Sequence, residues 1–187
     1  MSIEMLIADL SHDPFNPTLN FDCAVEYERL KQTSSAVSFY LRAAEYGVDS
    51  EPSIVYTSLI KVAQCIESQN DRVHTVSNCL LQAISYLPYR PEAYFFMSQF
   101  YERSQQWQES YTFARMGSMQ SITGTLPIET GYYGSYCLMF QQAVSAWWIG
   151  RKDESIKLML ELESMDIAPE YQVAVQSNLE RIRNVVV

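Results

Sequence analysis

The sequence has few of the residues that most catalytic and metal sites require. Its 187 residues include two histidines, His12 and His74, and neither stands beside a cysteine or a pair of carboxylates. The six glycines are scattered, so they form neither of the glycine-rich phosphate-binding motifs, GxGxxG and GxxxxGK. We therefore predict no catalytic residues, no metal ligands and no cofactor, and a protein that is not an enzyme.

Basic residues are also scarce. The chain has 13 Lys and Arg against 22 Asp and Glu, for a formal net charge of −9. Affinity for phosphate groups comes from Lys and Arg that displace counterions, so we expect neither nucleic acid nor an anionic membrane surface as a partner.

Long hydrophobic runs and paired cysteines are missing as well. No basic region accompanies the short apolar run at residues 5–8, and the most apolar later stretch, residues 143–149, is too short to cross a bilayer. The four cysteines, Cys23, Cys65, Cys79 and Cys137, include no CxxC pair. These features indicate reduced core thiols in a cytoplasmic protein without membrane insertion.

One sparse pattern recurs four times along the chain. In the first copy, Ala24 and Tyr27 are followed after nine residues by Ala36, then by Tyr40 and Ala43 at steps of four and three. Steps of three and four place residues on one helix face, and the gap between the two groups fits a tight turn between antiparallel helices. Each copy therefore predicts a helical hairpin whose apolar face only a neighbouring hairpin can cover.

The copies predict how the chain is organised. We expect an N-terminal extension at residues 1–15 and a single domain at 16–187, with hairpins at about 17–50, 53–88, 91–118 and 136–163. Residues 118–134 hold three glycines and a proline, which predicts a long loop that is either a spacer or a flap over a binding groove. Residues 169–187 have helical spacing and are expected to cap the array.

These residues resemble the tetratricopeptide repeat (TPR), a helical hairpin with small residues at positions eight, twenty and twenty-seven. The third copy matches best, with Tyr101 at position eleven and Trp107 at seventeen, although Ser110 and Gly117 are weak replacements for alanine. The resemblance covers roughly residues 17–163. It implies an all-α fold, a right-handed α-solenoid of TPR-like helical hairpins with a C-terminal capping helix.

A narrower resemblance is carried by three segments, NPTLNFDCAVEYERLKQTSSAVSFYLRAAE, RPEAYFFMSQFYERSQQWQESYTFA and AVSAWWIGRKDES. Together they are similar to helical repeat modules found beside glycosyltransferase or methyltransferase domains in proteins of marine cyanobacteria and their phages. This resemblance implies that a partner enzyme or an envelope-modifying pathway is nearby. It transfers no catalytic residue to this chain.

The TPR resemblance also implies a binding surface, because the first helix of each TPR hairpin lines a concave groove. Carboxylate-clamp TPRs have Lys and Asn in this groove, whereas this chain has Phe, Ile and Gln, which suits an amphipathic helix or an extended apolar segment. The alternative for each side chain is packing against the next helix. The residues at the groove positions are Phe21, Val25, Ile60, Gln64, Phe95, Gln99, Phe140, Val144 and Trp147.

The function that these features predict is a non-enzymatic interaction or scaffold module that docks another protein or a peptide segment. One alternative is a structural component of a larger assembly such as a phage particle. Another is an accessory subunit of a glycosyltransferase-type, envelope-modifying enzyme. The sequence leaves open whether the chain also forms a homo-oligomer.

Overall fold

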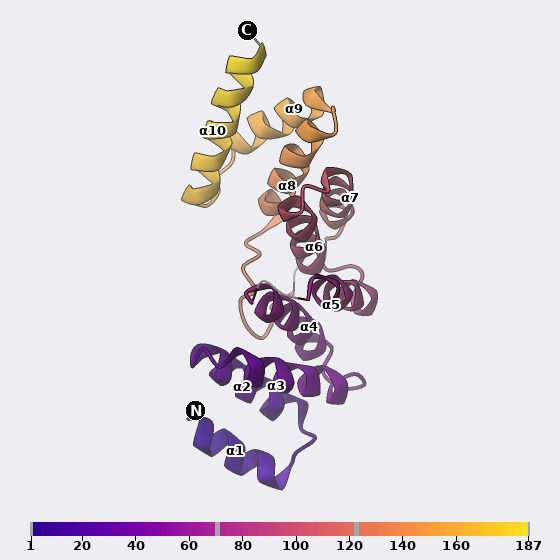
Figure 1. Cartoon of the computed structure of the whole chain (residues 1–187), viewed down its shortest axis with the longest axis vertical. Helices are drawn as coiled ribbons and strands as arrows, with labels where there is room; N and C mark the ends of the chain where they lie inside the picture. Colours follow the sequence, from indigo (N-terminus) through magenta and orange to yellow (C-terminus); the bar gives the residue numbers. More distant parts are fainter. Residues whose placement is uncertain (1, 70–71, 122–123, 187) are drawn as a thin grey trace. The chain divides into compact units, whose positions relative to one another are not determined.

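The computed structural model describes residues 2–69, 72–121 and 124–186, and in these ranges it contains helices and no strands (Figure 1). This confirms the predicted all-α class. The helices are α1 (Ile3–His12), α2 (Pro17–Arg29), α3 (Thr33–Tyr46), α4 (Pro52–Glu67), α5 (Val73–Tyr86), α6 (Glu92–Arg103), α7 (Trp107–Ser118), α8 (Ser135–Trp148), α9 (Lys152–Glu163) and α10 (Pro169–Val186).

The helices form two compact units. Unit 1 comprises Met1–Pro88 and Thr123–Thr130, and unit 2 comprises Tyr89–Ile122 and Gly131–Val187. Within unit 1 each helix from α1 to α5 packs on the next in sequence, and within unit 2 the same holds from α6 to α10. Packing between sequence neighbours is the arrangement of a helical solenoid. That residues 16–187 form a single domain stays a prediction.

Small residues at the repeated positions let the helices of each hairpin approach closely. In unit 1, Ala24, Ala36 and Ala43 are completely buried where α2 meets α3. In unit 2, Ser98 and Ser110 occupy equivalent positions, and Ser98 Oγ donates a hydrogen bond to the Ser110 carbonyl over 2.9 Å. Because the buried hydroxyl has a partner, serine replaces alanine there without leaving an unsatisfied polar group.

We had expected Gly117 to be a weak replacement for alanine. The packing instead requires a glycine at this position. A Cβ atom at this position of α7 would lie 2.7 Å from Tyr94 Cβ and 2.8 Å from Leu138 Cδ2. Tyr94 belongs to α6 and Leu138 to α8, so the α7 backbone touches both neighbouring helices here. Only a residue without a side chain fits this approach.

Residues 1–15, expected as an extension, contain the helix α1. Leu6 and Leu10 are buried and pack in one cluster with Cys23 of α2, and Ile3 packs against the same cluster. The spacing of three and four from Ile3 to Leu10 is the helical signal in this short segment. The helix therefore covers apolar surface of the first hairpin.

Among the described residues, the turn of each hairpin includes a residue in the left-handed backbone region. The φ angles are 58° at Lys31, 59° at Arg72, 57° at Gln105 and 84° at Gly150. For a residue with a Cβ, this conformation costs roughly 1–2 kcal/mol. The turns after α2, α6 and α8 therefore share one geometry, with this residue two positions before the next helix, and only the last of the three has a glycine there. Arg72 stands directly before α5.

The four cysteines are buried and free, which confirms that they are core thiols. Burial raises the pKa of the Cys23 thiol, and likewise that of Cys65, to about 11. These thiols remain protonated at neutral pH, and a protonated thiol is a poor nucleophile.

Replacing Gly117 by alanine should lower the free energy of unfolding by about 1–3 kcal/mol, because overpacking outweighs the gain in helix propensity. Urea denaturation followed by circular dichroism measures this change. The neighbouring exposed position of α7 is the control, and Ser118→Ala should change the stability by less than about 0.5 kcal/mol. Unchanged or higher stability of Gly117→Ala would contradict the close approach of α6, α7 and α8.

The turn residues allow a reciprocal test. Gln105→Gly should raise the free energy of unfolding by about 0.5–1 kcal/mol, because relief of the left-handed strain exceeds the entropy that glycine adds to the unfolded chain. Gly150→Ala should lower the stability by about 1–2 kcal/mol from backbone strain alone, since no atom lies within 4 Å of the added Cβ. Equal signs for the two changes in thermal denaturation would contradict the shared turn geometry.

Candidate functional site

In unit 1, two of the predicted groove residues belong to the core. Phe21 is 3% exposed and packs edge-on against Tyr40, with ring centroids 5.6 Å apart. Ile60 is completely buried on α4. Val25 is half-buried on α2. Phe21 and Ile60 therefore belong to the core and expose almost no surface to a partner, which corrects our expectation for both.

Gln64, the remaining predicted residue of unit 1, is already bound to the long loop. Its Nε2 donates a hydrogen bond of 2.7 Å to the carbonyl of Thr130, and Thr130 is buried. The Thr130 carbonyl thus accepts the hydrogen bond that we had expected Gln64 to offer a partner. This contact supports the flap alternative for the loop, of which residues 122–123 lie outside the described residues.

A charged group of unit 1 is also satisfied internally. The Glu28 carboxylate accepts a hydrogen bond from the Tyr40 hydroxyl over 2.7 Å and forms an ion pair with Lys61 over 2.6 Å. Burial, together with the hydrogen bond to Glu28, raises the pKa of Tyr40, so its hydroxyl stays a donor. This network joins α2, α3 and α4, and its role is structural.

In unit 2, Phe95 is likewise a core residue and does not line a groove. It is 1% exposed, and its ring centroid lies 5.1 Å from that of Phe96 and 5.5 Å from that of Tyr132. Gln99, on the same helix, is half-buried. We had expected Phe95 to face a partner, but Tyr132 from the long loop packs against its ring.

Phe140 is held by the C-terminal helix. It is half-buried, and its ring packs edge-on against Tyr171 of α10 with centroids 5.4 Å apart. Both rings pack against a buried cluster that includes Met159 and Leu162 of α9. Phe140 therefore helps to fix the position of α10 against α8 and α9.

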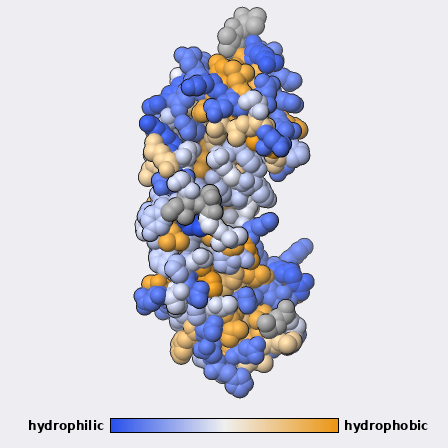
Figure 2. Space-filling view, turned by 180° about the vertical axis from the view of Figure 1, so that it is seen from behind, coloured by the Kyte–Doolittle hydropathy of each residue, from blue (hydrophilic) through white to orange (hydrophobic). Residues whose placement is uncertain are grey.

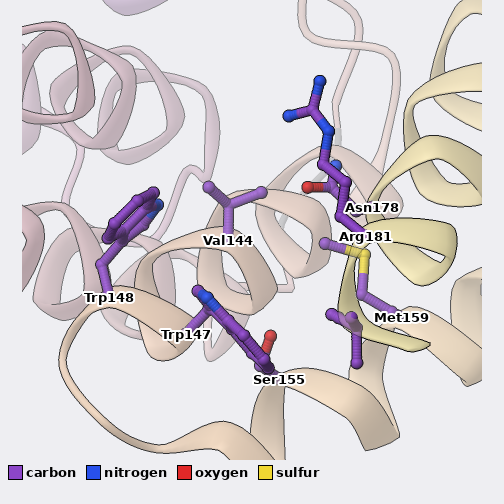
Figure 3. Close-up of a pocket in the computed structure, with 8 residues that line it drawn as sticks. Val144, Trp147, Trp148, Ser155, Met159, Asn178 and Arg181 are labelled. Atoms are coloured by element: carbon purple, nitrogen blue, oxygen red, sulfur yellow. The ribbon is translucent and has the colours of Figure 1, made fainter. Parts of the chain in front are cut away.

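Val144 and Trp147 do line a cavity, which has a volume of about 250 Å³ and lies where α8, α9 and α10 meet (Figure 3). Each of the three helices contributes to its wall. Met159, which is 1% exposed, is part of the apolar lining. The lining residues are Val144, Trp147, Trp148, Ser155, Met159, Asn178, Arg181 and Ile182.

The residues from α10 are those that the sequence analysis missed, because we had assigned this helix only a capping role. Asn178 follows Val144, and Arg181 follows Trp147, by 34 residues, which is the length of one TPR. This spacing is the signal that could have found them. In its contribution to the cavity, α10 acts like the first helix of a further repeat.

The cavity has a cationic rim. Arg181 is the charged member of the lining, is exposed, and forms no ion pair with the described residues. The Lys152 ammonium lies 5.1 Å from the centre of a ring of Trp147. Asn178 uses its amide nitrogen to donate to the Ala174 carbonyl over 2.8 Å. An apolar interior is thus bordered by positive charge in a chain whose net charge is −9.

The walls of the cavity are held in place by contacts of their own. Ser155 Oγ donates a hydrogen bond of 2.7 Å to the Ala143 carbonyl, which joins α9 to α8. Trp148 stacks on Trp107 with ring centroids 5.2 Å apart, although Trp148 is 61% exposed. A site with fixed walls loses less conformational freedom when it binds a ligand.

Apolar surface is visible near the C-terminus, where orange patches lie among hydrophilic side chains at the top of Figure 2. Exposed apolar residues of unit 2 include Leu160 and Val173, at 48% and 68%. Single exposed apolar residues are normal on protein surfaces. We therefore base the site on the cavity and not on these residues.

A metal site and a membrane-spanning helix receive no support from the described residues. Within the described ranges, no cluster of three or more His, Cys, Asp and Glu side chains could hold a metal ion. In the same part of the chain, no helix combines the length and the apolar character needed to cross a membrane.

The contrast between Phe95 and Trp147 gives a prediction. Phe95→Ala should lower the free energy of unfolding by about 3–5 kcal/mol, because it removes a buried aromatic side chain. Trp147→Ala removes a half-buried side chain at the cavity, and it should cost clearly less. Chemical denaturation of both variants measures the difference. Equal losses, or a larger loss for Trp147→Ala, would contradict the assignment of Phe95 to the core.

Comparison with known proteins relates this chain to others by fold. No protein-family model matches it, and no curated protein matches. Among solved structures it is similar to MamA (15% identity, TM-score 0.64, covering 86% of each chain) and to pilF of Pseudomonas aeruginosa (9%, 0.69, 94% of this chain and 72% of that one). A thermophilic TPR protein of Thermus thermophilus is also similar (14%, 0.59, 95% and 88%). The chain therefore has the fold of TPR proteins, an all-α solenoid of helical hairpins.

Proposed function

We propose that this protein is a non-enzymatic docking module that holds a segment of another polypeptide in the cavity between α8, α9 and α10. The observation that carries the proposal is that Val144 and Trp147, two residues expected to bind a partner, line this cavity. The TPR-like fold of the neighbours supports an interaction or scaffold role. Because a fold does not imply a function, the proposal rests on the site.

The composition of the cavity suits a polypeptide. Tryptophan and arginine are the residues most enriched at the centres of protein interfaces, and the lining includes both. The volume of about 250 Å³ is slightly below the range of about 300–1,000 Å³ that is typical of drug-sized ligands. The cavity is therefore suited to one or two side chains that a longer segment inserts.

Further parts of the proposal rest on the sequence alone. The net charge of −9 supports a protein partner over nucleic acid. A glycosyltransferase-type enzyme as the partner is an alternative that rests on the narrower sequence resemblance alone. A cytoplasmic location rests on the unpaired cysteines. The neighbours favour neither the glycosyltransferase alternative nor that of a structural assembly component.

A pull-down from the native source with quantitative mass spectrometry tests this function. Trp147→Ala should reduce retention of the specific partner by about tenfold or more, since truncation of a central interface tryptophan typically costs about 2 kcal/mol or more. Val144→Ala should reduce retention by a smaller factor. Val173→Ala is the matched control, because Val173 is exposed on α10 and does not line the cavity. Equal retention by wild type and Trp147→Ala would refute docking at this site.

A further inference from the structure

We propose that the segment held in this cavity carries a large apolar side chain next to an acidic one. The apolar group enters the cavity, and the carboxylate binds the guanidinium of Arg181. This inference rests on the proposed docking function and deepens it, because it names the chemistry of the partner.

The interior of the cavity selects the apolar group. Five of its eight lining residues are apolar or aromatic, contributed by α8, α9 and α10. Ser155 already donates its hydroxyl proton to the Ala143 carbonyl, so this polar group of the wall is satisfied within the protein. A carbonyl or carboxylate brought into this interior would lose hydration without gaining a hydrogen-bond donor from Ser155. Leucine, methionine and phenylalanine side chains avoid that cost.

The rim selects the acidic group through charge complementarity. Arg181 is the charged residue of the lining, and its neighbour Glu180 is not part of that lining. Lys152, over the Trp147 ring, adds a second positive charge beside the cavity. A guanidinium donates two parallel hydrogen bonds to one carboxylate, which fixes the position of the partner as well as its charge.

The placement of Arg181 explains why the two groups must be adjacent on the partner. Figure 3 shows the guanidinium pointing away from Met159, whose side chain belongs to the apolar interior. An anion at Arg181 therefore stays at the exposed rim while the apolar side chain goes inside. Neighbouring residues on one face of a segment meet both requirements at once.

The same features disfavour a phosphate-rich partner. Nucleic acid binding requires many cations to displace counterions, whereas this site offers Arg181 and Lys152 on a chain with a net charge of −9. A single carboxylate needs only one guanidinium. The structure thus favours an acidic polypeptide over a polyanion.

The experiment measures binding of fluorescein-labelled synthetic peptides to the full chain by fluorescence anisotropy. The first probe is a short helix-forming peptide with Glu and Leu four residues apart, so that both lie on one helix face, and the matched probes carry Gln in place of Glu or Ala in place of Leu. Wild type should bind the Glu-Leu peptide about fivefold more tightly than the Gln-Leu peptide, as expected for a solvent-exposed ion pair of up to about 1 kcal/mol. The Ala probe should bind more weakly than either.

Arg181→Gln should remove the preference for Glu over Gln. Arg183→Gln is the matched control, because it makes the same charge change at an exposed position of the same helix outside the cavity lining, and it should keep the preference. Equal binding of the Glu and Gln peptides to wild type, or equal effects of the two arginine changes, would overturn the inference.

Two further results separate this inference from the proposed function. If the peptides show no preference but Trp147→Ala still loses the native partner, the acidic-apolar chemistry is wrong and docking at the cavity stands. If Trp147→Ala retains the native partner, docking itself is wrong. Self-association that light scattering detects in wild type and not in Arg181→Gln would make a second copy of this chain the occupant and would also overturn the inference.

Discussion

The close approach of paired helices is the constraint on which the rest of the structure depends. It requires small residues at fixed positions, such as Ala24 and Ala36 in unit 1 and Gly117 in unit 2, where a single added carbon would overlap Tyr94. Helices that pack at such positions leave their larger side chains beside the contact line. Both the buried core and the surface available to a partner follow from this arrangement.

The candidate site is a consequence of how the array ends. The last helix, α10, packs on α9 and also contacts α8, and its residues Asn178 and Arg181 repeat the spacing of the preceding hairpin. The helix covers the apolar side of α9, as a capping helix does, and at the same time completes the wall of a cavity. Capping and binding are therefore combined in one element.

The long loop between α7 and α8 contacts two of the predicted groove residues, Gln64 and Phe95. In unit 1 its Thr130 carbonyl accepts the hydrogen bond of Gln64, and in unit 2 its Tyr132 packs on Phe95. The positions that in a simple repeat array face a partner are thus engaged by the protein itself. This difference leaves the α8–α10 cavity, with Val144 and Trp147, as the best supported site.

The spacing of small and large residues was enough to predict helical hairpins, because a period of three and four residues is a property of the chain alone. The sequence also indicated core cysteines. Val144 and Trp147, which the sequence placed in a concave groove, line the cavity between α8, α9 and α10. Only the tertiary structure decided that Phe21, Ile60 and Phe95 are buried and that Arg181 borders the site. The physical reason is that the exposure of a side chain depends on which distant segments pack against it, and local periodicity carries no information about those segments.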